Sequence, residues 1–237
     1  MRKNSARTVR RIRRRIIRPL LKSVRMVYRM RMVYSVRTRI IRPLLGRALD
    51  FIIGIESTTQ QYEGLVQPSD HPHLYGYQAS YWLAVVAGLR GFRIGSEDVF
   101  VDFGCGKGRA LYVASWYPFR QVIGVELDPQ IASIARRNMA RARGPRSLRA
   151  VQIIDGDARF VELPDNLRVA FFYNPFGGAV FRTVIERLKN HADNRQSPLR
   201  VIYANATESG TLLELGFVLV RKSAHCYVFD YHPGSAC

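Results

Sequence analysis

Residues 99–111 read VFVDFGCGKGRAL, and the rest of the chain is organised around this stretch. An apolar run typical of a buried strand ends at Asp102, glycines follow at 104, 106 and 108, and helix-forming residues begin at Arg109. Glycine allows a positive φ and lets a ligand approach where a Cβ would clash. The first N–H groups of a helix also lack partners within the helix. A strand that passes through a glycine turn into a helix is typical of a nucleotide-binding corner.

The acid at the strand tip indicates the charge of the ligand. The pattern is Asp-x-Gly-x-Gly-x-Gly, whereas a dinucleotide-binding fingerprint would be Gly-x-Gly-x-x-Gly. The carboxylate of Asp102 would repel a pyrophosphate placed at this turn. A cationic ligand group therefore fits this corner better than a phosphate does.

The segment VDFGCGKGR resembles motif I of the class I S-adenosylmethionine (SAM) methyltransferases. In that family the loop wraps the methionine part of SAM, and the acid faces its ammonium group. The resemblance implies that Asp102, Gly104 and Gly106 hold this end of the cofactor. Together with VIGVELDP at 122–129, the segment is similar to bacterial members of unassigned substrate and to small lysine methyltransferases that act on membrane-associated proteins. An ordinary glycine turn between strand and helix is the alternative.

Acidic residues at two further strand ends extend the resemblance. Glu126 ends the next apolar run, 20 residues after Gly106, where an acid can accept hydrogen bonds from both ribose hydroxyls. The segment Asp155-Gly156-Asp157-Ala158 resembles the family's GDA segment, which implies that Asp157 binds the adenine amino group with Ala158 beside it. The alternatives are a surface charge at 126 and an Asp-Gly turn without a binding role.

The segment 172–177, FYNPFG, resembles motif IV of the amino-methylating enzymes. The carboxamide oxygen of Asn174 and the carbonyl of Pro175 could both accept N–H bonds from a nitrogen that is being methylated. Such contacts would position its lone pair and stabilise developing positive charge. The family pattern has two prolines and this chain has one, which weakens an adenine- or glutamine-specific interpretation. A purely structural Asn-Pro turn is the alternative.

Strand and helix patterns alternate along the rest of the chain, which predicts an α/β fold. Expected strands cover 98–103, 121–126, 150–154, 168–173, 200–204, 217–221 and 225–231. Expected helices cover 82–91, 108–116, 129–143, 178–190 and 207–214. We therefore expect a doubly wound, mostly parallel seven-stranded sheet of the Rossmann-like class I methyltransferase type, with a C-terminal antiparallel hairpin. Tyr75 and Gln78 are expected to cover the cofactor, and Lys107 and Arg109 to be exposed at the loop.

The positive charge of the chain is concentrated at its N-terminus. Residues 1–47 contain 15 arginines, 2 lysines and no acid, whereas residues 48–237 contain 20 basic and 18 acidic side chains. Apolar residues at helical spacing and a repeated IIRPLL segment predict short cationic amphipathic helices. We therefore expect a basic extension at 1–49 and a methyltransferase domain at 50–237. A disordered tail, an anionic membrane anchor, a nucleic-acid-binding arm and a transit peptide all remain open for the extension.

Composition argues against zinc sites, CxxC redox motifs and membrane-spanning segments. The three cysteines form no CxxC pair, the five histidines show no zinc spacing, and no apolar run reaches the length of a membrane span. We expect no metal and a cytoplasmic protein, with peripheral association at the inner face of the membrane as one option.

The motifs together predict a SAM-dependent N-methyltransferase that acts on a macromolecule, through a protein lysine or another amino group. One alternative is an RNA base N-methyltransferase that holds RNA with its basic arm. Another is a SAM-binding scaffold without activity, whose arm binds membrane or RNA. In each case we expect residues 1–47 to be dispensable for SAM binding and to serve localisation or substrate delivery.

Overall fold

The computed structural model describes residues 42–57 and 79–234. The chain divides into two compact units, Met1–Leu49 and Asp50–Cys237, and each is described by itself. Helix α4, Arg42–Ile53, begins in the first unit and ends in the second. The helices predicted within residues 1–41, and the predicted covering residues Tyr75 and Gln78, lie outside the described residues.

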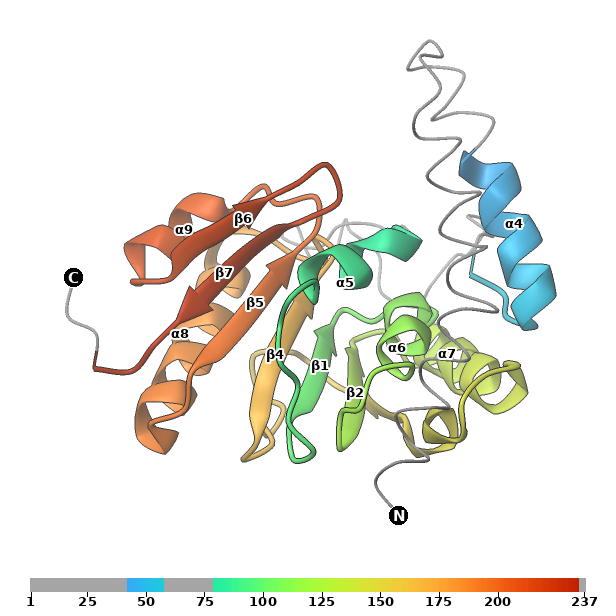
Figure 1. The fold of residues 1–237 in the computed structure, drawn as a ribbon, viewed down its shortest axis with the longest axis horizontal. Coiled ribbons are helices and arrows are strands. Elements are labelled where there is room, and N and C mark those ends of the chain that lie inside the picture. The colour runs from blue at the N-terminus through green and yellow to red at the C-terminus, as the bar shows by residue number, and fades with distance from the viewer. Residues whose placement is uncertain (1–41, 58–78, 235–237) are drawn as a thin grey trace, which may run out of the picture. The chain divides into compact units, whose positions relative to one another are not determined.

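Seven strands form one sheet in the second unit (Figure 1). Their bounds are β1 Val99–Phe103, β2 Gln121–Glu126, β3 Gln152–Asp155, β4 Leu167–Phe172, β5 Leu199–Tyr203, β6 Val218–Lys222 and β7 Tyr227–Tyr231. The strand order is β3-β2-β1-β4-β5-β7-β6, and β7 is the strand that runs antiparallel to the others. The predicted doubly wound, mostly parallel sheet with a C-terminal antiparallel hairpin is confirmed.

Helices connect the parallel strands. Their bounds are α5 Trp82–Gly88, α6 Arg109–Ala114, α7 Pro129–Arg141, α8 Gly178–Arg195 and α9 Ser209–Glu214, with a 3₁₀ turn, η3, at Arg146–Ala150. The start of α7 is capped: the Asp128 side chain accepts hydrogen bonds from the N–H groups of Gln130 and Ile131, and Pro129 occupies the first helical position.

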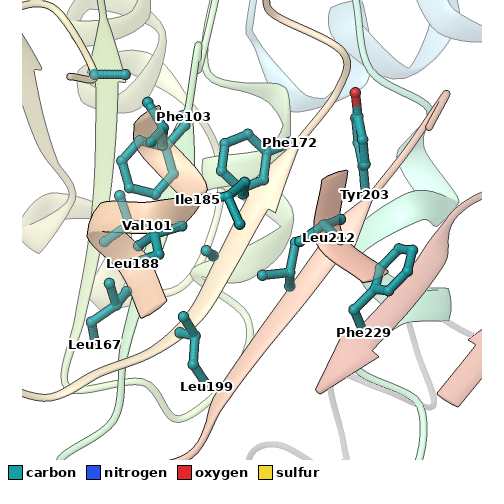
Figure 2. Close-up of a cluster of buried hydrophobic side chains, with 14 of the residues drawn as sticks. Val101, Phe103, Leu167, Phe172, Ile185, Leu188, Leu199, Tyr203, Leu212 and Phe229 are labelled. Carbon is teal, nitrogen blue, oxygen red and sulfur yellow. The ribbon is translucent and has the colours of Figure 1, made fainter. Parts of the chain in front are cut away.

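The main hydrophobic core lies between the sheet and α8. Every residue of β1 is buried, and alternate residues of that strand, Val99, Val101 and Phe103, belong to this core. Figure 2 shows Ile185 and Leu188 of α8 packed among the side chains of the strands. Asp102 belongs to the other alternating set of β1, and it lies near the carboxyl edge of the sheet.

Several predicted boundaries shift by a few residues in the structure. β3 begins at Gln152 rather than residue 150, because residues 146–150 form the turn η3. α8 continues to Arg195 rather than ending near residue 190, because Ala192 in its extra turn is still buried against the core. Within the described residues, no helix is long and apolar enough to cross a bilayer.

Candidate functional site

The glycine loop between β1 and α6 turns back over the end of β2. Gly104, Gly106 and Gly108 have φ angles of 73°, 55° and 86°, which are unfavourable for residues with a Cβ. The N–H groups of Gly104 and Cys105 both donate to the carbonyl of Val125, each at 2.9 Å. The loop therefore lies over the carboxyl ends of two adjacent parallel strands.

Glu126 joins the end of β2 to this loop. Its Oε2 accepts a hydrogen bond of 2.8 Å from the N–H of Gly106, and its Oε1 accepts one of 3.1 Å from the N–H of Asp128. The pKa of the Glu126 carboxyl is raised, because the effect of burial exceeds the lowering effect of these backbone donors. Each carboxylate oxygen has further lone pairs, so the side chain can accept additional hydrogen bonds while it holds the loop.

Asp102 is the most buried acid of the site. The residue is 2 % exposed, and burial, together with the nearby Glu126 charge, raises the pKa of its carboxyl well above the ordinary value. No side chain or N–H group in the described ranges 42–57 and 79–234 hydrogen-bonds to this carboxylate. A cationic group bound beside Asp102 would favour its charged form and relieve this cost.

Asp157 lies just beyond the end of β3, and its carboxylate already has a partner. It accepts hydrogen bonds from the side chain of Arg159, with Nη2 at 2.6 Å from Oδ2, and from the N–H of Arg159 at 2.8 Å. Ala158 is buried, and its carbonyl accepts a hydrogen bond from Arg187. The sequence analysis does not predict Arg159 as a site residue. Its position two residues after Asp157 could have indicated a local ion pair with that carboxylate.

Asn174 occupies the loop after β4 in a left-handed conformation, with φ 48°. Its Oδ1 accepts hydrogen bonds from the hydroxyl of Thr207 at 2.6 Å and from that of Tyr203 at 3.2 Å. Its predicted role as an acceptor for the substrate N–H stays a prediction, and its partners in the structure are Tyr203 at the end of β5 and Thr207 in the loop that follows. Tyr203 and Thr207 were missed from the sequence because the contact joins two strand ends about 30 residues apart.

Pro175 packs directly on the glycine loop. A Cβ on Gly104 would lie only 2.3 Å from the Cβ of Pro175, which is inside any allowed contact. Glycine at this position therefore lets the loop after β4 approach the loop after β1. The structure thereby brings together the residues predicted from the first and fourth motifs.

Gly104→Ala should lower the free energy of unfolding by about 2–3 kcal/mol, through backbone strain at positive φ and the clash with Pro175. Gly91→Ala is the matched control, because Gly91 has φ 75° but no heavy atom lies within 4 Å of the position that its Cβ would take. The control should cost only about 1 kcal/mol. Urea unfolding of both variants measures the difference, and equal losses would show that the contact with Pro175 is not tight.

The strand order and the glycine loop can be compared with solved structures. A crystal structure of the glycopeptide N-methyltransferase MtfA complexed with sinefungin superposes with a TM-score of 0.51 at 10 % identity, covering 68 % of this chain and 90 % of that one. A second MtfA structure gives a TM-score of 0.50 at 12 % identity, covering 65 % and 91 %. This chain has the class I SAM methyltransferase fold. The fold that the motifs predicted is confirmed.

A similarity to a curated protein agrees with the fold. The chain is 32 % identical over 79 residues to the probable SAM-dependent methyltransferase CRG1 of Saccharomyces cerevisiae. This match covers 33 % of the chain and only 27 % of the yeast protein. No protein-family model matches the chain.

The first turn of α6 in this class I fold contains a buried cation, Arg109, that was expected at the surface. Arg109 is 7 % exposed, and its Nε and Nη1 donate to the hydroxyl of Ser57 at 2.9 Å and the carbonyl of Ser80 at 2.8 Å. Its Nη2 lies 3.6 Å from Oδ1 of Asp50, and its guanidinium stacks over the ring of Trp82. The expected exposure of Arg109 is wrong, because segments distant in the sequence supply its partners.

Lys107 is also buried, so its predicted exposure is wrong as well. The residue is 1 % exposed, and its Nζ lies 3.9 Å from Oε1 of Glu56. Burial lowers the pKa of Lys107, while the charges of Glu56 and Asp50 oppose this effect. Asn138 of α7 links the same two segments, because its side-chain amide donates hydrogen bonds to the carbonyls of Lys107 and Glu56. The glycine loop is therefore anchored to residues 50–57 by buried polar contacts.

Proposed function

We propose that this chain is a SAM-dependent methyltransferase that transfers a methyl group to a nitrogen of a macromolecular substrate. One observation carries the proposal: the buried carboxylate of Asp102 and the half-buried carboxylate of Glu126 lie at the carboxyl ends of adjacent parallel strands, on either side of a positive-φ glycine loop. This edge is where open α/β sheets bind their ligands. A pair of acids at this edge suits a ligand with a cationic end and a ribose better than it suits a pyrophosphate.

The proposed roles follow from the geometry of each group. Asp102 would face the ammonium of SAM, with Gly104 and Gly106 allowing close approach of the main chain. Glu126 would accept hydrogen bonds from the ribose hydroxyls while it keeps its bond to the N–H of Gly106. Asp157 would bind the adenine amino group beside Ala158, on lone pairs that it does not use for Arg159.

Asn174 and Pro175 would form the acceptor side of the site, because their turn packs on Gly104. SAM supplies an electrophilic methyl group on a sulfonium, and the acceptor nitrogen needs its lone pair in line with that group. The carboxamide of Asn174, held by Thr207 and Tyr203, would fix the shape of this turn. The acceptor N–H groups would then bond to carbonyl oxygens of the turn, which positions the nitrogen and stabilises its growing charge.

The protein should bind both SAM and S-adenosylhomocysteine, and Glu126→Ala should weaken SAM binding by about 1–3 kcal/mol, as expected for hydrogen bonds to a charged group. Titration calorimetry measures both. Glu162→Ala is the control, because it removes the same charge from an exposed site outside the glycine loop. Absence of binding of either ligand to the unaltered protein would refute the proposed function.

The substrate class can be assigned by labelling a cell lysate with tritiated-methyl SAM and treating the product with protease or nuclease. Within the proposed class of macromolecular acceptors we favour a protein amino group, so we expect protease to release the label. Label released by nuclease would instead indicate that the protein is an RNA base N-methyltransferase. Label in neither fraction, with SAM binding intact, would favour a scaffold without activity on macromolecules.

A further inference from the structure

Positive charge in the second unit is concentrated in one segment. Residues 129–154 contain six arginines and no acid. The rest of residues 48–237 contains 14 basic and 18 acidic side chains, so this segment is a basic region on an otherwise acidic domain. Such an uneven distribution indicates a surface that meets an anionic partner.

Four of these arginines line a single recess. Arg141, Arg143, Arg146 and Arg149 are exposed and surround a recess of about 800 Å³, here called the arginine groove. Buried Met139 and Leu148 also contribute to its lining. Across the described ranges, none of the four guanidinium groups has an acidic partner, whereas the nearby Arg136 of α7 pairs with Asp155 at 2.5 Å. The groove thus combines uncompensated charge with an apolar component.

Exposed apolar side chains lie next to the groove. Phe51 is 87 % exposed and Ile52 is 56 % exposed at the end of α4. The carbonyl of the next residue, Ile53, accepts a hydrogen bond of 2.8 Å from the N–H of Arg143, which fixes the end of α4 beside the groove. Exposed aromatic and aliphatic residues next to arginines are typical of surfaces that bind the membrane interface.

We propose that the arginine groove binds the phosphates of anionic phospholipid headgroups, and that Phe51 and Ile52 enter the interface beside it. The planar guanidinium forms paired hydrogen bonds with phosphate oxygens. RNA phosphates would use the same arginines but would gain nothing from burying Ile52, so a bilayer matches the whole surface better. The residues of this site all belong to the second unit.

The position of the groove is compatible with access to the cofactor edge. The last turn of α7 contacts the glycine loop, because Asn138 donates a hydrogen bond of 2.8 Å to the carbonyl of Lys107. Met139, which also lines the groove, lies against Gly108 of the same loop. A membrane bound at the groove would therefore hold the glycine loop close to the membrane surface, where an acceptor could be presented.

The test compares two double variants of the full chain that remove the same charge. Arg146→Gln/Arg149→Gln alters the groove, and Arg90→Gln/Arg93→Gln alters exposed arginines elsewhere. Binding is measured to vesicles with one phosphatidylglycerol for every two phosphatidylcholines and, separately, to a single-stranded RNA oligonucleotide. Both variants keep residues 1–47, so any contribution of that segment is the same in the comparison.

The groove variant should lose vesicle affinity by roughly fivefold for each arginine, and on the order of twentyfold for the pair. The control should change by no more than about threefold, through general screening of charge. Phe51→Ser should also weaken vesicle binding, and this loss should persist at high salt because apolar burial is not screened. Thermal unfolding and SAM calorimetry establish that each variant is folded, independently of any methyl transfer.

Equal losses in the groove and control variants would overturn the proposal, because they would indicate diffuse attraction without a site. Loss of RNA binding with unchanged vesicle binding would also overturn it and identify RNA as the occupant. Unchanged vesicle binding by Phe51→Ser would exclude insertion of the end of α4.

Discussion

Arg109→Met should lower the free energy of unfolding by about 3–5 kcal/mol, the cost of breaking a buried ion pair by removing one partner. The methionine would occupy similar space but could not donate to Ser57 or Ser80, and it would remove the contact between Nη2 and Oδ1 of Asp50. The loss should be larger than for any surface arginine, because Arg109 is 7 % exposed and its partners come from separate segments.

Urea unfolding monitored by circular dichroism measures this loss. Arg182→Met is the control, because Arg182 pairs with Glu214 at the surface and should contribute only about 0–1 kcal/mol. A double-mutant cycle with Asp50→Asn should give a coupling energy of about 1–3 kcal/mol. If Arg109→Met costs less than the surface control, the network does not anchor the first turn of α6.

Asn174→Ala should reduce the rate of methyl transfer by about 10²–10³-fold and leave SAM binding nearly unchanged, because the residue would act on the acceptor and not on the cofactor. The substitution also removes a residue that tolerates φ 48°. Asn205→Ala is therefore the matched control, since Asn205 has φ 51° in an exposed position and should cost the same backbone strain without a loss of rate. Single-turnover labelling of the lysate substrate, with calorimetry of SAM, separates rate from binding.

Thr207→Val distinguishes two roles for the carboxamide of Asn174. If the bond from Thr207 holds Asn174 in position, removing the hydroxyl should lower the rate, and Thr207→Ser should restore it. If the carboxamide oxygen itself must accept the N–H of the substrate, removing its competitor should leave the rate unchanged or raise it. We expect the first result, because the bond to Thr207 is short, at 2.6 Å, and Tyr203 bonds to the same oxygen. Asn174→Ala at full rate would show that this turn is purely structural.

Local sequence pattern was sufficient to predict the elements that carry the cofactor motifs. Apolar runs that end in an acid, a glycine turn and an N-capped helix each depend on neighbouring residues, so β1, the glycine loop and the start of α7 were predictable. Parallel strands present their carboxyl ends at one edge, so the proximity of Asp102 and Glu126 also followed from the pattern. The boundaries of β3 and α8 did not, since packing decides where an element ends.

The sequence by itself determined the class of fold and the edge of the sheet where ligands bind. Only the tertiary structure decided which polar groups are buried and which partners they have. Arg109 reaches Ser57 across 52 positions, and Thr207 reaches Asn174 across 33, so no local pattern could predict either contact. The arginine groove is a similar case. Its charges are visible in the sequence, but the recess that they line and the exposure of Phe51 near it are not. The physical reason is that burial and hydrogen-bond geometry depend on contacts between distant segments, whereas periodicity and turn chemistry depend on neighbours along the chain.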